Sequence, residues 1–144
     1  MERKNPVPQG KYVPAVRYGN LIFTAGMTPR LNGVATMARR VKASDPLELY
    51  RDAARLAASN ALNAALNKLN EGEKLAQVLD LKVYINAEDD FTAHAKLADF
   101  VSEYLCEELG EAGIAPRAAI GMGTLPAVAP IEVQLICAAE SFEK

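Results

Sequence analysis

Two stretches in the C-terminal fifth of the chain limit its possible folds more than any other feature. Residues 115–126 and 130–137 have the apolar, partly alternating pattern of β-strands, and each carries one charged side chain near its middle or start, Arg117 and Glu132. A charge within such a strand is costly to bury unless a counter-charge, water or a ligand offsets its desolvation. The pattern therefore predicts two neighbouring strands whose charges form either a structural ion pair or a small acid-binding site.

Length and hydropathy predict one domain, spanning residues 1–144, that is surrounded by water. The chain has 144 residues, of which 50% are hydrophobic, enough for one core and too few for two domains. No stretch approaches the length of a membrane span, and residues 1–10 lack the apolar segment of a signal peptide. We therefore expect a cytoplasmic protein that has no membrane partner.

Charge and motif content argue against several classes of partner. The formal net charge of −2 gives no broad positive field, so a nucleic acid is not an expected partner. Cys106 and Cys137 are not in Cys-x-x-Cys spacing and the chain has one histidine, His94, so neither a metal site nor a disulfide framework is expected. No glycine-rich nucleotide loop occurs either. The sequence therefore predicts no metal and no cofactor, and we interpret His94 as a surface or half-buried structural histidine.

Two helices are predicted from capping signals and apolar periodicity. The first begins at Asp45, interpreted as an N-cap that precedes a first-turn proline, and runs through an alanine-rich segment to about Leu69. The second begins near Asp89 or Asp90 and ends at Gly110. The many alanines of the first helix would allow it to approach a sheet closely.

The remaining segments predict strands, in the order β-β-β-α-β-α-β-β. Residues 21–26 are apolar and uncharged, residues 78–86 alternate, and Asn32-Gly33 is typical of a two-residue hairpin turn. This order indicates a two-layer α+β domain in which the helices cover one face of a sheet made of all the strands. The other face would retain exposed apolar side chains, so we expect a homo-oligomer.

Several motifs resemble those of the RidA/YjgF family. They are Ala115-Pro116-Arg117, Leu125-Pro126, Ile131-Glu132, Tyr12-Val13-Pro14-Ala15-Val16, Gly19 to Gly26, Asn60-Ala61-Leu62, Val83-Tyr84-Ile85 and Asp90-Phe91. The family comprises reactive-intermediate deaminases, and older descriptions of it include translation inhibitor and endoribonuclease. The resemblance implies a chorismate-mutase-like homotrimer with three clefts between subunits. It also implies hydrolysis of enamines or imines, such as 2-aminoacrylate, to a 2-oxo acid and ammonia.

The resemblance also implies roles for particular residues. Arg117 would grip the carboxylate of the substrate through the two parallel bonds of its guanidinium, and Glu132 would orient or activate the attacking water. Tyr12 would line the pocket, and the backbone at Ala119 would bind the nitrogen end of the substrate. The expected ligand is thus a small carboxylate-bearing molecule at a subunit interface.

The chain departs from the family pattern at four positions of this pocket. It has Ala25 where many members have serine, Met27 in place of glutamine, Ala119 in place of cysteine and Asp89 in place of asparagine. The pocket should therefore be less polar than in other members. Two hypotheses remain open, a hydrolase of reactive imines or enamines, and a trimeric binding module that holds small 2-oxo or related carboxylic acids without activating water.

Overall fold

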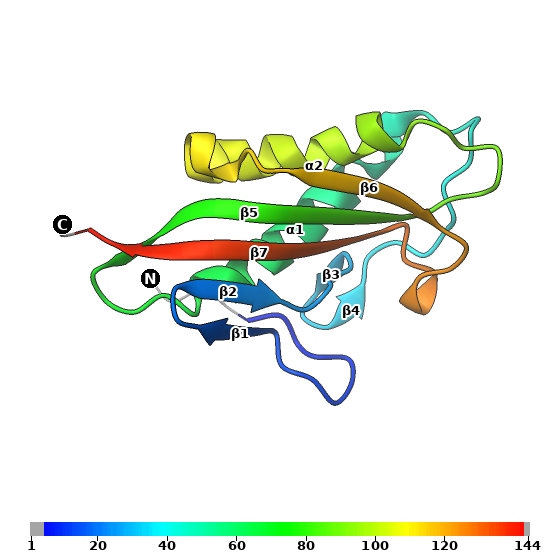
Figure 1. Cartoon of the computed structure of the whole chain (residues 1–144). Helices are drawn as coiled ribbons and strands as arrows, with labels where there is room; N and C mark the ends of the chain where they lie inside the picture. Colours follow the sequence, from blue (N-terminus) through cyan, green and yellow to red (C-terminus); the bar gives the residue numbers. More distant parts are fainter. Residues whose placement is uncertain (1–4, 143–144) are drawn as a thin grey trace.

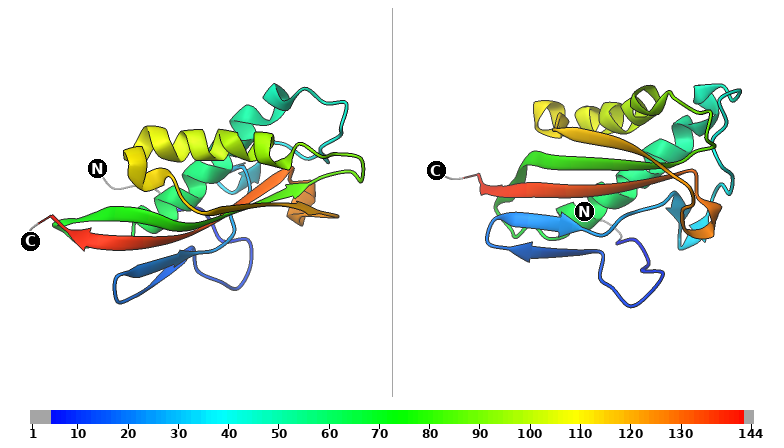
Figure 2. Two further views of the ribbon diagram at one scale, coloured as in Figure 1. Left: turned by 45° about the horizontal axis from the view of Figure 1, so that its top comes forward. Right: turned by 45° about the vertical axis from the view of Figure 1, so that its right-hand side comes forward.

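Two helices lie side by side on one face of a five-stranded sheet, and the opposite face of the sheet is not covered by a helix (Figures 1 and 2). The structure is a computed structural model, and it describes residues 5–142. The strands are β1 (Ala15–Tyr18), β2 (Leu21–Thr24), β3 (Arg30–Leu31), β4 (Val34–Ala35), β5 (Glu73–Asn86), β6 (Arg117–Met122) and β7 (Ile131–Ser141). The helices are α1 (Arg51–Leu66) and α2 (His94–Leu109), with short 3₁₀ turns η1 (Leu47–Tyr50), η2 (Gly110–Gly113) and η3 (Pro126–Val128). The predicted two-layer α+β class is confirmed.

The strand order of the main sheet is β1-β2-β7-β5-β6. The long central strand β5 pairs antiparallel with β7 and parallel with β6. The prediction that the two C-terminal strands are neighbours was therefore wrong, because β5 lies between them. Helix α2 makes the crossover that a parallel β5–β6 pair requires.

The strands β3 and β4 do not join the main sheet. They form a separate two-stranded hairpin, so the prediction of one sheet made of all the strands was also wrong. Its predicted turn is confirmed, since Asn32 and Gly33 both have positive φ, at 53° and 81°. Positive φ at both central positions is what a type I′ turn requires. The hairpin stands beside the helical layer and does not extend the sheet. Its residues pair with each other, Arg30 with Ala35 and Leu31 with Val34, and not with β2 or β7.

The core lies between the sheet and the helices. Every second residue of β7 is buried against the helices, beginning with Ile131 and Val133, as the alternating pattern predicts. Helix α1 meets this surface with small side chains, among them Ala54, Ala57 and Ala61, which are fully buried. Alanine brings the helix backbone close to the sheet and loses no side-chain entropy, which explains the alanine-rich sequence.

The predicted helix starts differ from those observed. The carboxylate of Asp45 accepts bonds from the backbone of Lys42, at 2.8 Å, and from the hydroxyl of buried Tyr50, so it does not cap the first turn. Helix α1 begins after η1 and ends at Leu66, three residues before the predicted Leu69. Helix α2 begins at His94 and not at Asp89 or Asp90, which lie in the preceding loop. At the first helix the difference arises because the Asp45 carboxylate bonds to Lys42 and Tyr50 instead of the backbone NH groups of the first turn.

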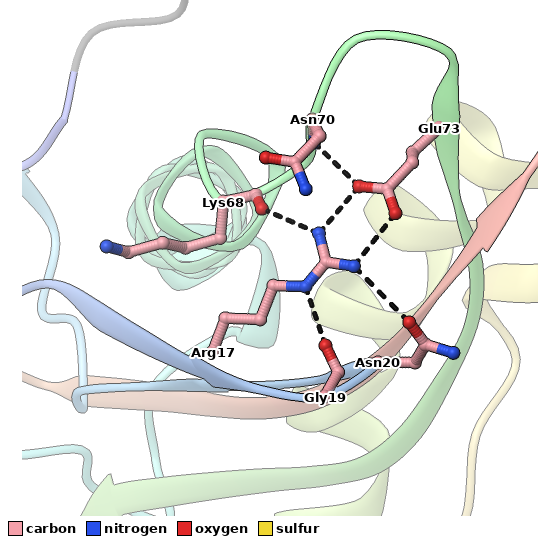
Figure 3. A network of polar contacts seen from close by, with 6 residues as sticks. All are labelled: Arg17, Gly19, Asn20, Lys68, Asn70 and Glu73. Carbon is pink, nitrogen blue, oxygen red and sulfur yellow. Dashed lines mark hydrogen bonds and ion pairs between the residues drawn. The ribbon is translucent and has the colours of Figure 1, made fainter.

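A charged network ties the β1–β2 hairpin to the connection between α1 and β5 (Figure 3). The guanidinium of Arg17 donates to both carboxylate oxygens of Glu73, at 2.6 and 2.8 Å, and to the backbone oxygens of Gly19 and Lys68. The backbone NH of Asn70 donates to the same carboxylate, at 2.7 Å. These bonds hold the pKa of Glu73 at about 2. The bidentate pair therefore fixes the edge of the sheet against the end of α1.

The described residues include neither a membrane-spanning helix nor a cluster of potential metal ligands. None of the helices in residues 5–142 is long and apolar enough to cross a membrane. Within the same part of the chain, no group of three or more histidine, cysteine or acidic side chains could hold a metal ion.

Candidate functional site

Glu132 lies near the start of β7, the middle strand, on the sheet face that no helix covers. It pairs across the sheet with Tyr84 of β5, and Tyr84 pairs in turn with Ile120 of β6. The hydroxyl of Tyr84 donates to Oε1 of Gln134, two residues along β7, at 3.0 Å. A carboxylate, an amide and a phenol thus form a polar row on this open face.

The carboxylate of Glu132 is half-buried and has no partner within residues 5–142. No hydrogen bond or ion pair joins it to another residue of this part of the chain, and burial raises its pKa above the ordinary value. The side chain lies directly against Gly26, where a Cβ would come within 2.3 Å of Oε2. A desolvated carboxylate without a counter-charge binds protons more tightly and is suited to accept a proton from water.

Arg117 lies at the start of β6, on the face that the helices cover. Its guanidinium donates to Oδ1 of Asp99 at 2.8 Å, to the hydroxyl of Ser102 at 3.1 Å and to the backbone oxygen of Ala95 at 3.2 Å, all on α2. The side chain of Arg117 is 20% exposed and that of Asp99 is 58% exposed. Arg117 therefore makes an ion pair with a distant residue while remaining in reach of solvent.

One chain does not bring Arg117 and Glu132 together. Arg117 pairs with Leu81 of β5 and Glu132 pairs with Tyr84, three residues further along. Because side chains alternate along a strand, these two positions of β5 lie on opposite faces, and so do their partners. An ion pair between the two is absent from the described chain, and a site that uses both would need more than one chain.

The comparisons with known proteins place the chain in a family. The family model for endoribonuclease L-PSP matches residues 2–139. The chain belongs to the endoribonuclease L-PSP family, which is the RidA/YjgF family. The solved structure of a proposed endoribonuclease from Shewanella oneidensis is similar, with a TM-score of 0.82 and 25% identity over 96% of this chain and 91% of that one.

Two further similar proteins have descriptions that name no reaction. A protein of unknown function from Agrobacterium tumefaciens has a TM-score of 0.77 and 28% identity, over 90% of this chain and 82% of that chain. The protein TCP17 of Trypanosoma cruzi is 26% identical over 130 residues, which are 90% of this chain and 81% of TCP17. The family and the fold are therefore shared with these proteins.

The other residues expected in the pocket of this L-PSP chain lie in different places. Tyr12 is exposed, and its hydroxyl accepts a bond from the backbone NH of Gln9 at 2.9 Å. Ala25 follows β2 directly, next to Gly26 and therefore near Glu132. Ala119 lies on the helix-covered face, where it packs against the core.

Asp89 and His94 lie just before α2 and at its first residue. Asp89 lies exposed in the loop before α2. His94 is half-buried at the start of α2, with its ring 5.0 Å from that of Phe91 in an edge-on contact, as expected of a structural histidine.

The sequence did not reveal the partner of Arg117. Asp99 is exposed on α2, and it occupies a polar position of an amphipathic helix like the other acidic residues there. Nothing in its local pattern separates it from a solvated charge. Only the packing of α2 across the edge strand β6 identifies it.

Proposed function

We propose that this protein hydrolyses imines or enamines of small carboxylic acids to 2-oxo acids and ammonia. The observation that carries the proposal is Glu132, a half-buried carboxylate with a raised pKa and no partner in residues 5–142. Charges without partners are rare inside proteins and are concentrated at functional sites. Membership of the L-PSP family, whose members the sequence resembles at this glutamate, supports the same assignment.

In this reaction Glu132 acts as general base and then as general acid. As the oxygen of water attacks the imine carbon, the carboxylate accepts one water proton and the imine nitrogen takes up a proton from solvent, giving a carbinolamine. Glu132 then returns its proton to the nitrogen, the C–N bond breaks, and the hydroxyl proton passes back to solvent as the C=O bond forms and ammonia leaves. The raised pKa of Glu132 favours both steps. A carboxyl whose pKa lies closer to neutral pH accepts a proton more readily and can still return it.

We further propose that the carboxylate of the substrate binds Arg117 of a neighbouring chain in a homotrimer. Arg117 lies at the edge of the sheet with part of its side chain exposed, and its Nε makes no hydrogen bond within residues 5–142. The open face around Glu132 carries exposed apolar side chains that a second chain could cover, namely Val16, Tyr18, Leu21, Phe23, Ile120 and Met122. The free thiols of Cys106 and Cys137 fit a reducing compartment, and we propose a cytoplasmic location.

A trimeric module that only binds small 2-oxo or related acids is the second candidate. The observation that favours it is the apolar replacement of the family's serine and glutamine by Ala25 and Met27, which flank the glycine that contacts Glu132. Without those polar groups the nitrogen of a substrate has fewer donors and acceptors to orient it. The two candidates differ in whether Glu132 transfers a proton.

The test supplies the protein with 2-imino acids, generated in place by an amino-acid oxidase, and follows the loss of the imine. Glu132→Gln should abolish the acceleration, because an amide fills the same space but cannot take up the proton. Glu140→Gln is the matched control, since it removes an exposed carboxylate from the other end of β7, next to Lys74. Full activity of Glu132→Gln would exclude the proposed proton transfer. Absence of activity in the parent, with 2-oxo acids still bound, would favour the binding module.

A further inference from the structure

His94 makes a close contact with the edge strand β6 that packing alone does not explain. Its ring meets Phe91 edge-on, and this contact orients the ring but gives neither nitrogen a hydrogen-bond partner. A Cβ built on Gly121 of β6 would come within 2.6 Å of Nε2, so a larger residue would displace the ring. Gly121 therefore leaves space for an imidazole nitrogen near the end of the strand that begins at Arg117.

Both ring nitrogens of His94 are available to a ligand. No hydrogen bond or ion pair joins them to another residue within residues 5–142. In this part of the chain, the buried side-chain nitrogens and oxygens that lack a partner are Nε of Arg30 and Nε of Arg39, so those of His94 keep contact with solvent. An accessible imidazole NH can donate to a ligand that approaches from solvent.

The backbone of β6 offers further hydrogen bonds along the free edge of the sheet. This strand pairs with β5 alone, and its other side has no neighbouring strand among the described residues (Figure 1). The oxygen of Met122 accepts from the NH of Ala87 at 3.2 Å, and every second residue of a parallel strand faces the same neighbour. The NH and C=O groups of Ala119 and Gly121 therefore point away from β5, towards the free edge.

Arg117 and His94 lie at the two ends of this edge, on one chain. The guanidinium of Arg117 donates to the backbone oxygen of Ala95, the residue that follows His94. Gly121, which His94 contacts, lies four residues after Arg117, about 13 Å along the strand. A five-carbon dicarboxylate that makes a hydrogen bond at each end spans a distance of this order, whereas a three-carbon acid does not.

We propose that His94 determines substrate specificity by binding a second carboxylate at the far end of the substrate, which is a five-carbon 2-imino dicarboxylic acid. Nε2–H donates to the distal carboxylate while Arg117 holds the first one, so the inference rests on the proposed function of Arg117. The first NH groups of α2, which no side chain caps, favour a negative group at the same place. An apolar substrate chain would instead leave the imidazole NH without an acceptor.

Two 2-oxo acids test this specificity by calorimetry, because their binding does not require turnover. 2-Oxoglutarate and 2-oxopentanoate have the same five-carbon chain, and only the first has a distal carboxylate. We expect the parent protein to bind 2-oxoglutarate about tenfold more tightly. His94 is the only histidine of the chain, so its ring ¹H–¹³C signal in untagged protein should shift with 2-oxoglutarate and not with 2-oxopentanoate. Equal affinity for the two acids would overturn the proposal.

Variants separate the imidazole from other groups on α2. His94→Phe should remove the preference for 2-oxoglutarate and leave the affinity for 2-oxopentanoate within about twofold, since a phenyl ring keeps the contact with Phe91 but has no NH. His94→Gln should keep part of the preference, because its amide can donate from a similar position. Lys96→Gln is the control, since it removes an exposed cation from the same turn and should leave the preference unchanged. A preference that survives in His94→Phe, or is lost in Lys96→Gln, would contradict the assignment.

Failure of this inference differs from failure of the proposed hydrolysis. A preference for 2-oxoglutarate that requires both Arg117 and His94, in a protein that hydrolyses no imine, would support the specificity and contradict the reaction. Imine hydrolysis without any preference between the five-carbon acids would contradict the specificity alone. Binding of 2-oxoglutarate that Arg117→Ala leaves unchanged would also overturn the inference, because the ligand would then lie elsewhere.

Discussion

At the scale of single residues, the contact between Gly26 and Glu132 determines where the proposed base can lie. A Cβ on Gly26 would come within 2.3 Å of Oε2, so Gly26→Ala should push the carboxylate away from its present position. The obstructing atom is the end of a flexible side chain and Gly26 has no positive φ, so the cost in stability should be small. We expect hydrolysis of 2-imino acids to fall by about tenfold or more, since misplacement of a catalytic group by an ångström is costly.

Gly123→Ala is the control for this change. No atom lies within 4 Å of a Cβ built there, and Gly123 likewise has no positive φ. It should keep both the activity and the melting temperature of the parent. If Gly26→Ala proved as active as Gly123→Ala, the position of Glu132 would be unimportant for the reaction.

Arg117 and Asp99 allow the binding role of the arginine to be separated from a structural one. Arg117→Ala should weaken binding of small 2-oxo acids by roughly tenfold to a hundredfold, because hydrogen bonds to charged groups contribute about 1.5–3 kcal/mol. Asp99→Ala removes the partner seen on α2 but leaves the guanidinium available. It should therefore bind 2-oxo acids at least as well as the parent, as measured by calorimetry.

The thermal stability of Arg117→Ala and Asp99→Ala tests the alternative, that Arg117 has only a structural role. More than half of the Asp99 side chain is exposed, and exposed ion pairs contribute about 1 kcal/mol or less. Both variants should then melt close to the parent. A large and equal loss of stability in both, without any effect of Arg117→Ala on ligand binding, would show that the arginine only anchors α2 to β6.

At the scale of elements, the Arg17–Glu73 pair predicts a pH-dependent contribution to stability. The folded state holds the pKa of Glu73 at about 2, below its ordinary 4.5, chiefly through the bond from Arg17. A carboxyl with a lowered pKa stabilises the fold above its unfolded pKa, and this contribution is lost as the pH falls through the folded value. Glu73→Gln should therefore lower the melting temperature at neutral pH.

The difference in melting temperature between Glu73→Gln and the parent should shrink as the pH falls from about 4.5 towards 2. Thermal unfolding followed by circular dichroism across this range measures it. Glu71→Gln is the control, because Glu71 is exposed in the same connection and makes no hydrogen bond or ion pair within residues 5–142. A deficit that stayed constant with pH would show that the variant acts through packing instead of charge.

Local signals in the sequence predicted those elements whose conformation depends on neighbouring residues alone. The turn at Asn32-Gly33 and the helix end at Gly110, where φ is 66°, follow from backbone preferences of these residue types. The inward side of β7 follows from its alternation. The cap assigned to Asp45 was wrong because Tyr50, a buried side chain five residues on, took the carboxylate as its partner.

Strand order could not be predicted in the same way, since it is decided by pairing between distant segments. Placing β5 between β6 and β7 separates two strands that follow each other along the chain. That placement also sets the register that sends Arg117 and Glu132 to opposite faces. The sequence therefore identified both charges as unusual, but the face on which each lies depends on contacts that no local pattern contains.

At the scale of the whole molecule, the apolar side chains on the open face predict an oligomer. Tyr18 is 84% exposed and Val16 is 51% exposed, both on the edge strand β1. A single chain gains nothing by leaving such side chains in water, whereas burial between chains contributes roughly 25 cal/mol for each Å² of apolar surface. Light scattering should give the mass of a trimer at micromolar concentration. A monomer mass would remove both the trimer and any site shared between chains.

Mixed trimers test whether each site takes Arg117 from one chain and Glu132 from the next. Arg117→Ala and Glu132→Gln chains are co-expressed with different affinity tags and purified on both tags, so that every trimer isolated contains each variant. Each such trimer has two chains of one variant and one chain of the other. In a ring of three, both compositions then have one cleft with both residues intact, one with neither and one with a single residue. The mixed trimers should therefore recover about one third of the parental rate, more than either variant alone. If both residues had to come from the same chain, no cleft would be complete and mixing would recover no activity.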